Sequence, residues 1–216
     1  MKKFRFALFV LAFLLAFCGG CSAKVNFADY VSENRKNFYV YESDTLKLKI
    51  FCTERETPFL LDGIRGDVVP IVEVFATFST VPSDVFIKVE GHEGEMNYHS
   101  VGCYFHLSFS SQDFGKQSVD ATLTFGQKTE TVKAQSVLYD GVITGEQAIN
   151  YAREYDGQTF DSLVENNLFK GEILVRLLHD EKCFYYVGVC NRSGDIVAFL
   201  VDGETGTVIA KKQLNA

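Results

Sequence analysis

The segment VDATLTF, residues 119–125, places apolar side chains at odd positions and polar side chains at even positions. Successive residues of a strand point to opposite faces of a sheet, so this period of two predicts a half-buried β-strand. Further runs of this kind, separated by turn residues, occupy residues 38–42, 45–52, 68–78, 84–90, 97–109 and 129–138. Seven short strands over about a hundred residues predict an antiparallel β-sandwich for residues 38–140.

The pattern changes after Gly141. Thr144 with Gln147 three positions later is typical of a capping box, which predicts a helix that runs to about Tyr155. A second short helix is predicted over residues 161–169. Four alternating runs joined by short turns then predict sequential antiparallel strands, at residues 172–178, 183–190, 196–202 and 207–212.

The predicted fold class is therefore mainly β with an α+β part. An antiparallel β-sandwich, immunoglobulin-like in the broad sense, occupies residues 38–140, although the chain has no tryptophan to supply the core residue of antibody domains. A helix with a four-stranded antiparallel meander occupies residues 141–216. The polar and weakly patterned residues 21–37 are expected to form a tether, with a short helix around Tyr30 and Val31 as the alternative.

The first twenty residues have the order of a secretory signal peptide. Lys2, Lys3 and Arg5 precede an apolar run over residues 6–17. That run is shorter than the roughly 20 apolar residues that a membrane-spanning helix needs.

The residues that follow, Cys18-Gly19-Gly20-Cys21, resemble the lipobox of bacterial lipoproteins. This resemblance implies cleavage after Gly20, removal of residues 1–20 and lipid attachment at Cys21. The family usually has Leu where this chain has Cys18. A plain cleaved signal peptide is the alternative reading.

The balance of charge bears on the partners. The formal net charge is −7, and removal of residues 1–20 takes away three basic residues and no acidic one, which leaves −10. Nucleic acid and anionic headgroups select basic surfaces, so no nucleic-acid partner is expected and membrane attachment is assigned to the lipid. The expected location is the cell envelope, at the outer face of the cytoplasmic membrane, or at the outer membrane if the organism has one.

Four cysteines lie in the body of the chain. Cys52 and Cys103 share parity with apolar neighbours in their predicted strands, so both thiols are expected to face one apolar layer. Either a Cys52–Cys103 disulfide or two buried free thiols fits this placement. Cys183 and Cys190 bracket one predicted strand and lie too far apart, at ~23 Å, to bond to each other.

Residues 141–216 resemble the PepSY domain of secreted and membrane-bound bacterial proteins. The likeness is carried by 143–149 (ITGEQAI), 185–189 (YYVGV), 193–195 (SGD) and 201–209 (VDGETGTVI). The predicted second helix and an extra strand depart from the minimal family pattern. The whole chain also resembles uncharacterised lipoproteins of Firmicutes. The PepSY resemblance implies a non-catalytic role in which the domain binds or restrains a peptidase or another envelope protein, through a strand edge or the helix-free sheet face.

No residue is assigned a catalytic, cofactor-binding or metal-binding role, and the chain is not expected to be an enzyme. The four histidines, His92, His99, His106 and His179, lie in no recognised nucleophile motif. His92, His99 and His106 recur every seven residues. A seven-residue step reverses the face of a strand, so His99 and His106 are expected to point to opposite sides.

Adjacent strand residues face opposite sides of a sheet, so Tyr185 and Tyr186 cannot both lie in the core. One of them is expected at the surface or against the other half of the chain. The function favoured by the sequence is an envelope protein that binds another envelope protein, with the β-sandwich as a spacer that holds the C-terminal part above the membrane. A solute-binding lipoprotein that serves a transporter is the alternative, and an envelope hydrolase is least favoured.

Overall fold

The computed structural model describes residues 25–60, 63–64 and 66–215. Its first half contains η1 (Phe27–Tyr30), β1 (Val31–Glu42), β2 (Leu46–Thr57), β3 (Asp67–Phe78), β4 (Phe86–Val89), β5 (His92–Glu95), β6 (Asn97–His99), β7 (Tyr104–Phe109), β8 (Ser118–Phe125) and β9 (Lys128–Ser136). The second half contains α2 (Gly145–Tyr155), α3 (Gly157–Asp161), β10 (Val164–Glu165), β11 (Leu168–Phe169), β12 (Glu172–His179), β13 (Cys183–Cys190), β14 (Ile196–Asp202) and β15 (Val208–Leu214). Residues 1–20, predicted to be a signal peptide, and the predicted lipid-attachment residue Cys21 lie outside the described residues.

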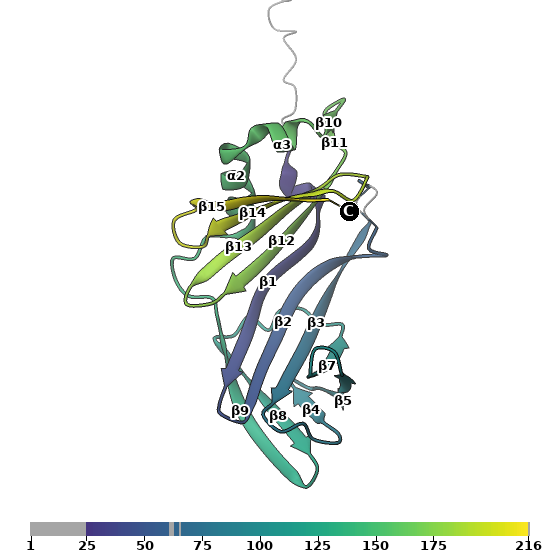
Figure 1. The fold of residues 1–216 in the computed structure, drawn as a ribbon, viewed down its shortest axis with the longest axis vertical. Coiled ribbons are helices and arrows are strands. Elements are labelled where there is room, and N and C mark those ends of the chain that lie inside the picture. Colours follow the sequence, from purple (N-terminus) through teal and green to yellow (C-terminus); the bar gives the residue numbers. More distant parts are fainter. Residues whose placement is uncertain (1–24, 61–62, 65, 216) are drawn as a thin grey trace, which may run out of the picture.

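Within the described residues, thirteen strands belong to one hydrogen-bonded sheet. Its main path is β15-β14-β13-β12-β1-β2-β3-β7-β6, and this path runs the length of the molecule (Figure 1). Strands β9, β8, β4 and β5 form a second layer at the end opposite α2 and α3. The mainly β, largely antiparallel architecture predicted from the sequence is confirmed, but both halves of the chain share one sheet.

Strand β1 joins the two halves. Its first residues pair in parallel with β12, with Arg35 beside Arg176, and residues 33–42 pair antiparallel with β2, with an irregularity between Arg35 and Asn37. Near its end it also pairs with β9, where Tyr39 lies beside Ser136. The expectation that residues 21–37 form a tether is therefore wrong from Val31 onward. The sequence did not predict residues 32–37 of this strand, because their side chains are polar. Polar side chains are accommodated there because β1 lies in the centre of the sheet, between charged neighbours on β2 and β12.

The first core lies between β1-β2-β3-β7 and the second layer. The alternation of residues 119–125 is confirmed in β8, where Val119, Ala121 and Leu123 are buried. Even-numbered residues of β2 and β3 face the same core, with Tyr39 from β1. The largest fully buried side chains here are Tyr39, Leu46, Leu48, Ile50, Ile87 and Leu123.

The second core lies between α2 and the meander β12–β15. The capping box is present, because the Thr144 hydroxyl accepts a hydrogen bond from the Gln147 amide and the Gln147 side chain accepts one from the Thr144 amide. Ala148, Ile149 and Ala152 form the buried face of α2. The four strands of the meander follow one another as antiparallel neighbours, as predicted.

Two segments differ from the prediction because turns interrupt them. The helix predicted over residues 161–169 is wrong: the short α3 ends at Asp161, and β10 and β11 form a hairpin. Asn166 and Asn167 both have positive φ at that turn, a conformation that suits a tight hairpin. The run predicted over residues 97–109 is likewise two strands, β6 and β7, which pair as a hairpin.

The N-terminal end of the described chain is fixed to the helical end of the molecule. The Phe27 ring packs edge-on against Phe160 and Phe169, with ring centroids 5.2 Å apart in both pairs. The Arg153 guanidinium lies 4.8 Å from the centre of the Phe27 ring. Val25 also packs against the second core. The chain therefore enters the fold beside α3, far from the β8–β9 hairpin at the other end (Figure 1).

Candidate functional site

The sheet has one covered face and one open face. Asn34 on β1 lies near Val175 and the start of α2, on the face that α2 and the second layer cover. Glu33 and Arg35 alternate with Asn34 and so project from the opposite face, which we call the helix-free face. Arg176 is paired with Arg35 and projects from that face as well.

Three arginines surround one buried carboxylate on the helix-free face. Glu33 has a side-chain exposure of 4%, its Oε2 lies 3.1 Å from the Arg55 Nε, and its Oε1 accepts a hydrogen bond from the Arg176 Nε. Arg35 completes what we call the arginine cluster: Arg35, Arg55 and Arg176 around Glu33. Because β1 lies between β2 and β12, the cluster draws residues from three adjacent strands.

The charges of this cluster determine the ionisation of Glu33. Burial disfavours its charged form, but the hydrogen bond from Arg176 and the positive charges of Arg176, Arg55 and Arg35 outweigh that effect. The pKa of Glu33 therefore lies below its ordinary value. The carboxylate is charged at neutral pH and both of its oxygens already bind arginine.

Arg35 differs from the other two arginines. Its guanidinium carbon lies 4.2 Å from the centre of the Phe51 ring, which is a cation–π arrangement. Its Nε is buried and, among the described residues, has no hydrogen-bond partner. Burial lowers the pKa of Arg35 and the nearby Glu33 charge opposes that shift, yet an arginine remains protonated. Arg35 is thus a charged group whose buried nitrogen lacks an acceptor.

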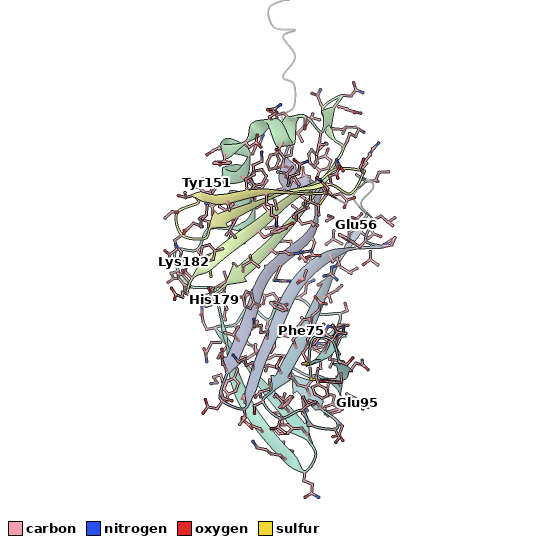
Figure 2. All side chains as sticks on the ribbon, in the orientation of Figure 1. Glu56, Phe75, Glu95, Tyr151, His179 and Lys182 are labelled. Atoms are coloured by element: carbon pink, nitrogen blue, oxygen red, sulfur yellow. The ribbon has the colours of Figure 1, made fainter. Side chains whose placement is uncertain are left out.

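A row of rings extends from Phe51 across the helix-free face. The first ring, Phe51, also packs on the buried Phe38 of the second core, with centroids 5.1 Å apart. Phe75 lies at the centre of the row, midway along the sheet between Glu56 and Glu95 (Figure 2). The ring centroids are 5.5 Å apart for Phe51 and Phe75, 5.3 Å for Phe75 and Tyr104, and 4.7 Å for Phe75 and His106. We call Phe51, Phe75, Tyr104 and His106 the aromatic row; all four are half-buried.

Glu73 connects the aromatic row with the arginine cluster. Its carboxylate lies 3.7 Å from the Arg55 Nη2 and 3.7 Å from the His106 Nε2. On the other side of the cluster, the Arg176 guanidinium lies 5.6 Å from the Tyr186 ring. Charged and aromatic groups therefore alternate over five adjacent strands, from β13 to β3.

The expectation that His99 and His106 face opposite sides is wrong. The chain turns between them, so His99 pairs with Tyr104 and His106 pairs with Asn97 across the hairpin. Paired residues share a face, and the His99 and Tyr104 rings stack with centroids 4.8 Å apart. His92 instead stacks on Phe109 at 4.3 Å. Within the described part of the chain, no group of three His, Cys, Asp or Glu side chains could hold a metal ion.

Tyr185 and Tyr186 separate as predicted. Tyr185 is buried under α2, where its hydroxyl donates a hydrogen bond to the Ile143 carbonyl at 2.9 Å. Tyr186 lies on the helix-free face near Arg176. The pair therefore marks the two faces of the C-terminal sheet.

A groove crosses the covered face between the two cores. Its largest part has a volume of about 480 Å³, and a neighbouring part has about 230 Å³. Asn34, Lys36 and the first residues of α2 line both parts. The Lys36 Nζ lies 2.5 Å from the Glu54 Oε1 within the groove. The lining of the groove therefore contains both apolar side chains and the Lys36–Glu54 ion pair.

All four cysteines of the body are free thiols, so the structure does not form the Cys52–Cys103 disulfide that the sequence left open. Cys52 is buried, as expected. Cys103 is exposed, in the turn between β6 and β7, and its φ is 53°. The turn interrupts the alternation on which the expected burial of Cys103 rested. Cys183 and Cys190 are buried at the two ends of β13.

The VDGETG segment, residues 201–206, is explained by a turn. The Asp202 Oδ1 accepts hydrogen bonds from the amides of Glu204 and Thr205, at 3.0 and 2.9 Å. Its other oxygen accepts a hydrogen bond from Lys182. The Lys182 bond and the backbone amides together hold the pKa of Asp202 well below its ordinary value. This motif therefore stabilises the β14–β15 connection.

Sequence reasoning missed the arginine cluster. Arg176 interrupts the apolar run EILVRLLH, residues 172–179, and a lone charge inside an apolar strand is a usable signal. Glu33 and Arg35 gave no such signal because the surrounding residues are polar. Only the pairing of β1 with both β2 and β12 brings Glu33 to Arg55 and Arg176.

No described helix is both long enough and apolar enough to cross a membrane. No protein-family model, curated protein or solved structure matches the chain.

Proposed function

We propose that this chain is a lipid-anchored, non-catalytic protein of the bacterial cell envelope that binds another envelope protein, such as a peptidase, through its helix-free face. One observation carries the proposal: the arginine cluster and the aromatic row form one partly exposed surface over five strands. Arginine and aromatic residues are enriched in protein–protein interfaces and dominate their binding energy.

The envelope location is supported by the sequence of the N-terminus. The basic residues, the short apolar run and Cys21 favour export followed by lipid attachment. In the C-terminal part, α2 followed by the β12–β15 meander supports the resemblance to the PepSY domain. The α3 helix and the β10–β11 hairpin depart from the family pattern. A broadly immunoglobulin-like reading of the N-terminal part is supported by its two β layers.

The entry point of the chain supports a particular orientation at the membrane. Cys21 precedes Val25 by four residues, and four residues span at most about 14 Å. A lipid on Cys21 would therefore hold the end with α3 and the β10–β11 hairpin close to the membrane. We propose that the β-sandwich points away from the membrane, which reverses the spacer arrangement expected from the sequence.

Site-specific photo-crosslinking in intact cells tests the proposal. A benzophenone side chain in place of Phe75 or Tyr186 samples the helix-free face, and the same group in place of Tyr155 samples the exposed end of α2. We expect one discrete protein adduct from Phe75 and Tyr186 and none from Tyr155. Equal background labelling at all three positions would count against this face as the binding surface.

Lipid attachment is tested separately. Mass spectrometry of the N-terminal peptide should show a diacylated Cys21 in the wild type, and Cys21→Ala should release the chain from the membrane fraction. An unmodified Cys21 on a freely secreted chain removes the anchor from the proposal without affecting the crosslinking result.

The groove favours a second candidate, a solute-binding lipoprotein that serves a transporter. Its volume of about 480 Å³ lies within the range of about 300–1,000 Å³ usual for small-molecule pockets. Native mass spectrometry of chain purified from its own envelope tests this candidate. A small molecule that stays bound to the wild type and is lost from Asn34→Leu would support this candidate. Detection of the ligand-free mass alone would count against it.

A further inference from the structure

The arginine cluster carries more positive than negative charge in an otherwise acidic protein. The cluster has the three guanidinium groups of Arg35, Arg55 and Arg176, and the nearby carboxylates are those of Glu33 and Glu73. Lys49 lies on the same face, because it is on β2 two positions before Phe51 and is paired with Phe75. The arginine cluster with Lys49 thus forms a locally basic patch within the helix-free face of a chain of net charge −7, and such a patch attracts an acidic group.

Glu33 and Glu73 leave the Arg35 Nε without a hydrogen-bond acceptor. Glu33 places one oxygen against Arg55 and the other against Arg176, so both of its oxygens are committed. Glu73 lies near Arg55 and His106. The Arg35 guanidinium stays on the Phe51 ring, and its buried Nε lacks an acceptor among the described residues.

Arg35 is also held in place before any ligand arrives. Contact with Phe51 fixes the plane of the guanidinium, so little side-chain entropy remains to be lost on binding. Because the Arg35 Nε is buried, a carboxylate from a partner would bind the terminal nitrogens of this half-buried guanidinium, through two parallel hydrogen bonds. Glu33, Arg55 and Arg176 hold the surrounding charges in a fixed arrangement beside it. These features describe a preorganised receptor for one more carboxylate.

We propose that Arg35 receives a carboxylate side chain from an acidic segment of the partner protein, and that apolar side chains of the same segment lie on the aromatic row. This inference deepens the proposed function and rests on the helix-free face being the contact surface.

The geometry of the row defines the segment further. Arg35, Phe51, Phe75 and Tyr104 lie on β1, β2, β3 and β7, which are successive strands of the sheet. Successive members of the row are 4.2, 5.5 and 5.3 Å apart, so the row runs diagonally over the strands and extends over at most about 15 Å. An extended peptide advances about 3.3 Å per residue, so four or five residues cover this distance. The segment therefore crosses the strands, with an acidic residue at one end and apolar residues after it.

Peptide binding measured by fluorescence anisotropy tests the inference on the mature chain in detergent. The probe is a fluorescein-labelled seven-residue peptide in which glutamate alternates with leucine, and its control has glutamine in place of every glutamate. We expect the glutamate peptide to bind at least tenfold more tightly than the glutamine peptide. Equal affinity of the two peptides would overturn the inference.

Arg35→Met keeps an apolar side chain against Phe51 and removes the charge, so it should weaken the glutamate peptide at least tenfold. Lys128→Gln removes a cation at the β8–β9 turn, away from the cluster, and should change affinity less than twofold. If Arg35→Met fails to fold, the affinity of Arg35→Lys is measured instead. Lysine keeps the positive charge but lacks the planar guanidinium that binds a carboxylate with two hydrogen bonds, so this variant should also bind the glutamate peptide more weakly. Unchanged affinity in a folded Arg35 variant would overturn the role of Arg35.

Other anions supply the remaining outcomes. Binding of inorganic phosphate or of phosphatidylglycerol vesicles through Arg35, without binding of the glutamate peptide, would contradict an acidic protein segment as ligand. A Phe75 crosslink in cells together with unchanged peptide binding by Arg35→Met would sink only this inference and leave the proposed function standing. Loss of the crosslink itself would sink the proposed function.

Discussion

Glu33 and Arg176 lie 143 positions apart in the chain and form a hydrogen-bonded ion pair across the parallel β1–β12 junction. The same carboxylate binds Arg55 on β2. One buried side chain therefore links the N-terminal strand to both halves of the sheet, and the stability of the junction depends on its charge.

Glu33→Gln should destabilise the fold by about 1–3 kcal/mol at neutral pH, because the half-buried Arg55 and Arg176 lose the carboxylate that they share. The pKa of Glu33 lies below its ordinary value in the folded state, so its contribution is present above the ordinary pKa of a glutamate. It is lost as the pH falls through the lowered folded-state pKa. Urea unfolding at about pH 7 and about pH 3 should show the difference between wild type and variant shrinking in acid.

The control for this prediction is Glu93→Gln. Glu93 is exposed and lies 3.7 Å from Lys88, so its removal should change the free energy of unfolding by less than about 1 kcal/mol. A Glu33→Gln variant as stable as this control at neutral pH would contradict the structural role of the ion pair.

The two halves should unfold together, because β1 belongs to both. Ile50 lies in the first core and Leu177 in the second, and both are fully buried. Replacement of either by alanine should cost about 2–5 kcal/mol. Differential scanning calorimetry should show a single transition that each variant lowers as a whole. Two separate peaks, each lowered by only one of the variants, would show that the halves fold independently.

Cys103 should be the only one of the four body cysteines that reacts rapidly with maleimide in the native protein. Burial raises the pKa of Cys183 to about 11 and that of Cys190 to about 12, and it raises the pKa of Cys52 as well. A thiol reacts as its thiolate, so these three are protected twice, by burial and by protonation. Peptide mapping by mass spectrometry after a short labelling pulse should find the label on Cys103, and on all four cysteines after denaturation.

Asp202→Ala should destabilise the fold by about 1–3 kcal/mol, because it removes the acceptor for two backbone amides and for Lys182. The matched control is Asp180→Ala in the exposed β12–β13 turn. The melting temperature should fall for the first variant and stay nearly unchanged for the second. Equal melting temperatures would mean that the VDGETG turn has no stabilising role.

The sequence by itself determined the local elements wherever one periodicity persisted. The alternation in residues 119–125 and 183–190 predicted β8 and β13, and the Thr144 capping box predicted the start of α2. These features depend on neighbours only a few residues away. The errors lie at turns, as at Cys103 and at Asn166, where a reversal of the chain changes which side chains share a face.

Only the tertiary structure decided that β1 is a central strand and that Glu33 forms ion pairs with Arg55 and Arg176. Strand pairing is a contact between distant parts of the chain, and the polar residues 32–37 have no apolar alternation that would predict a buried strand. Their polar side chains are accommodated because partners from β2 and β12 compensate their charges. The candidate site is built from such long-range pairings, whereas local preferences suffice to form the strands that carry it.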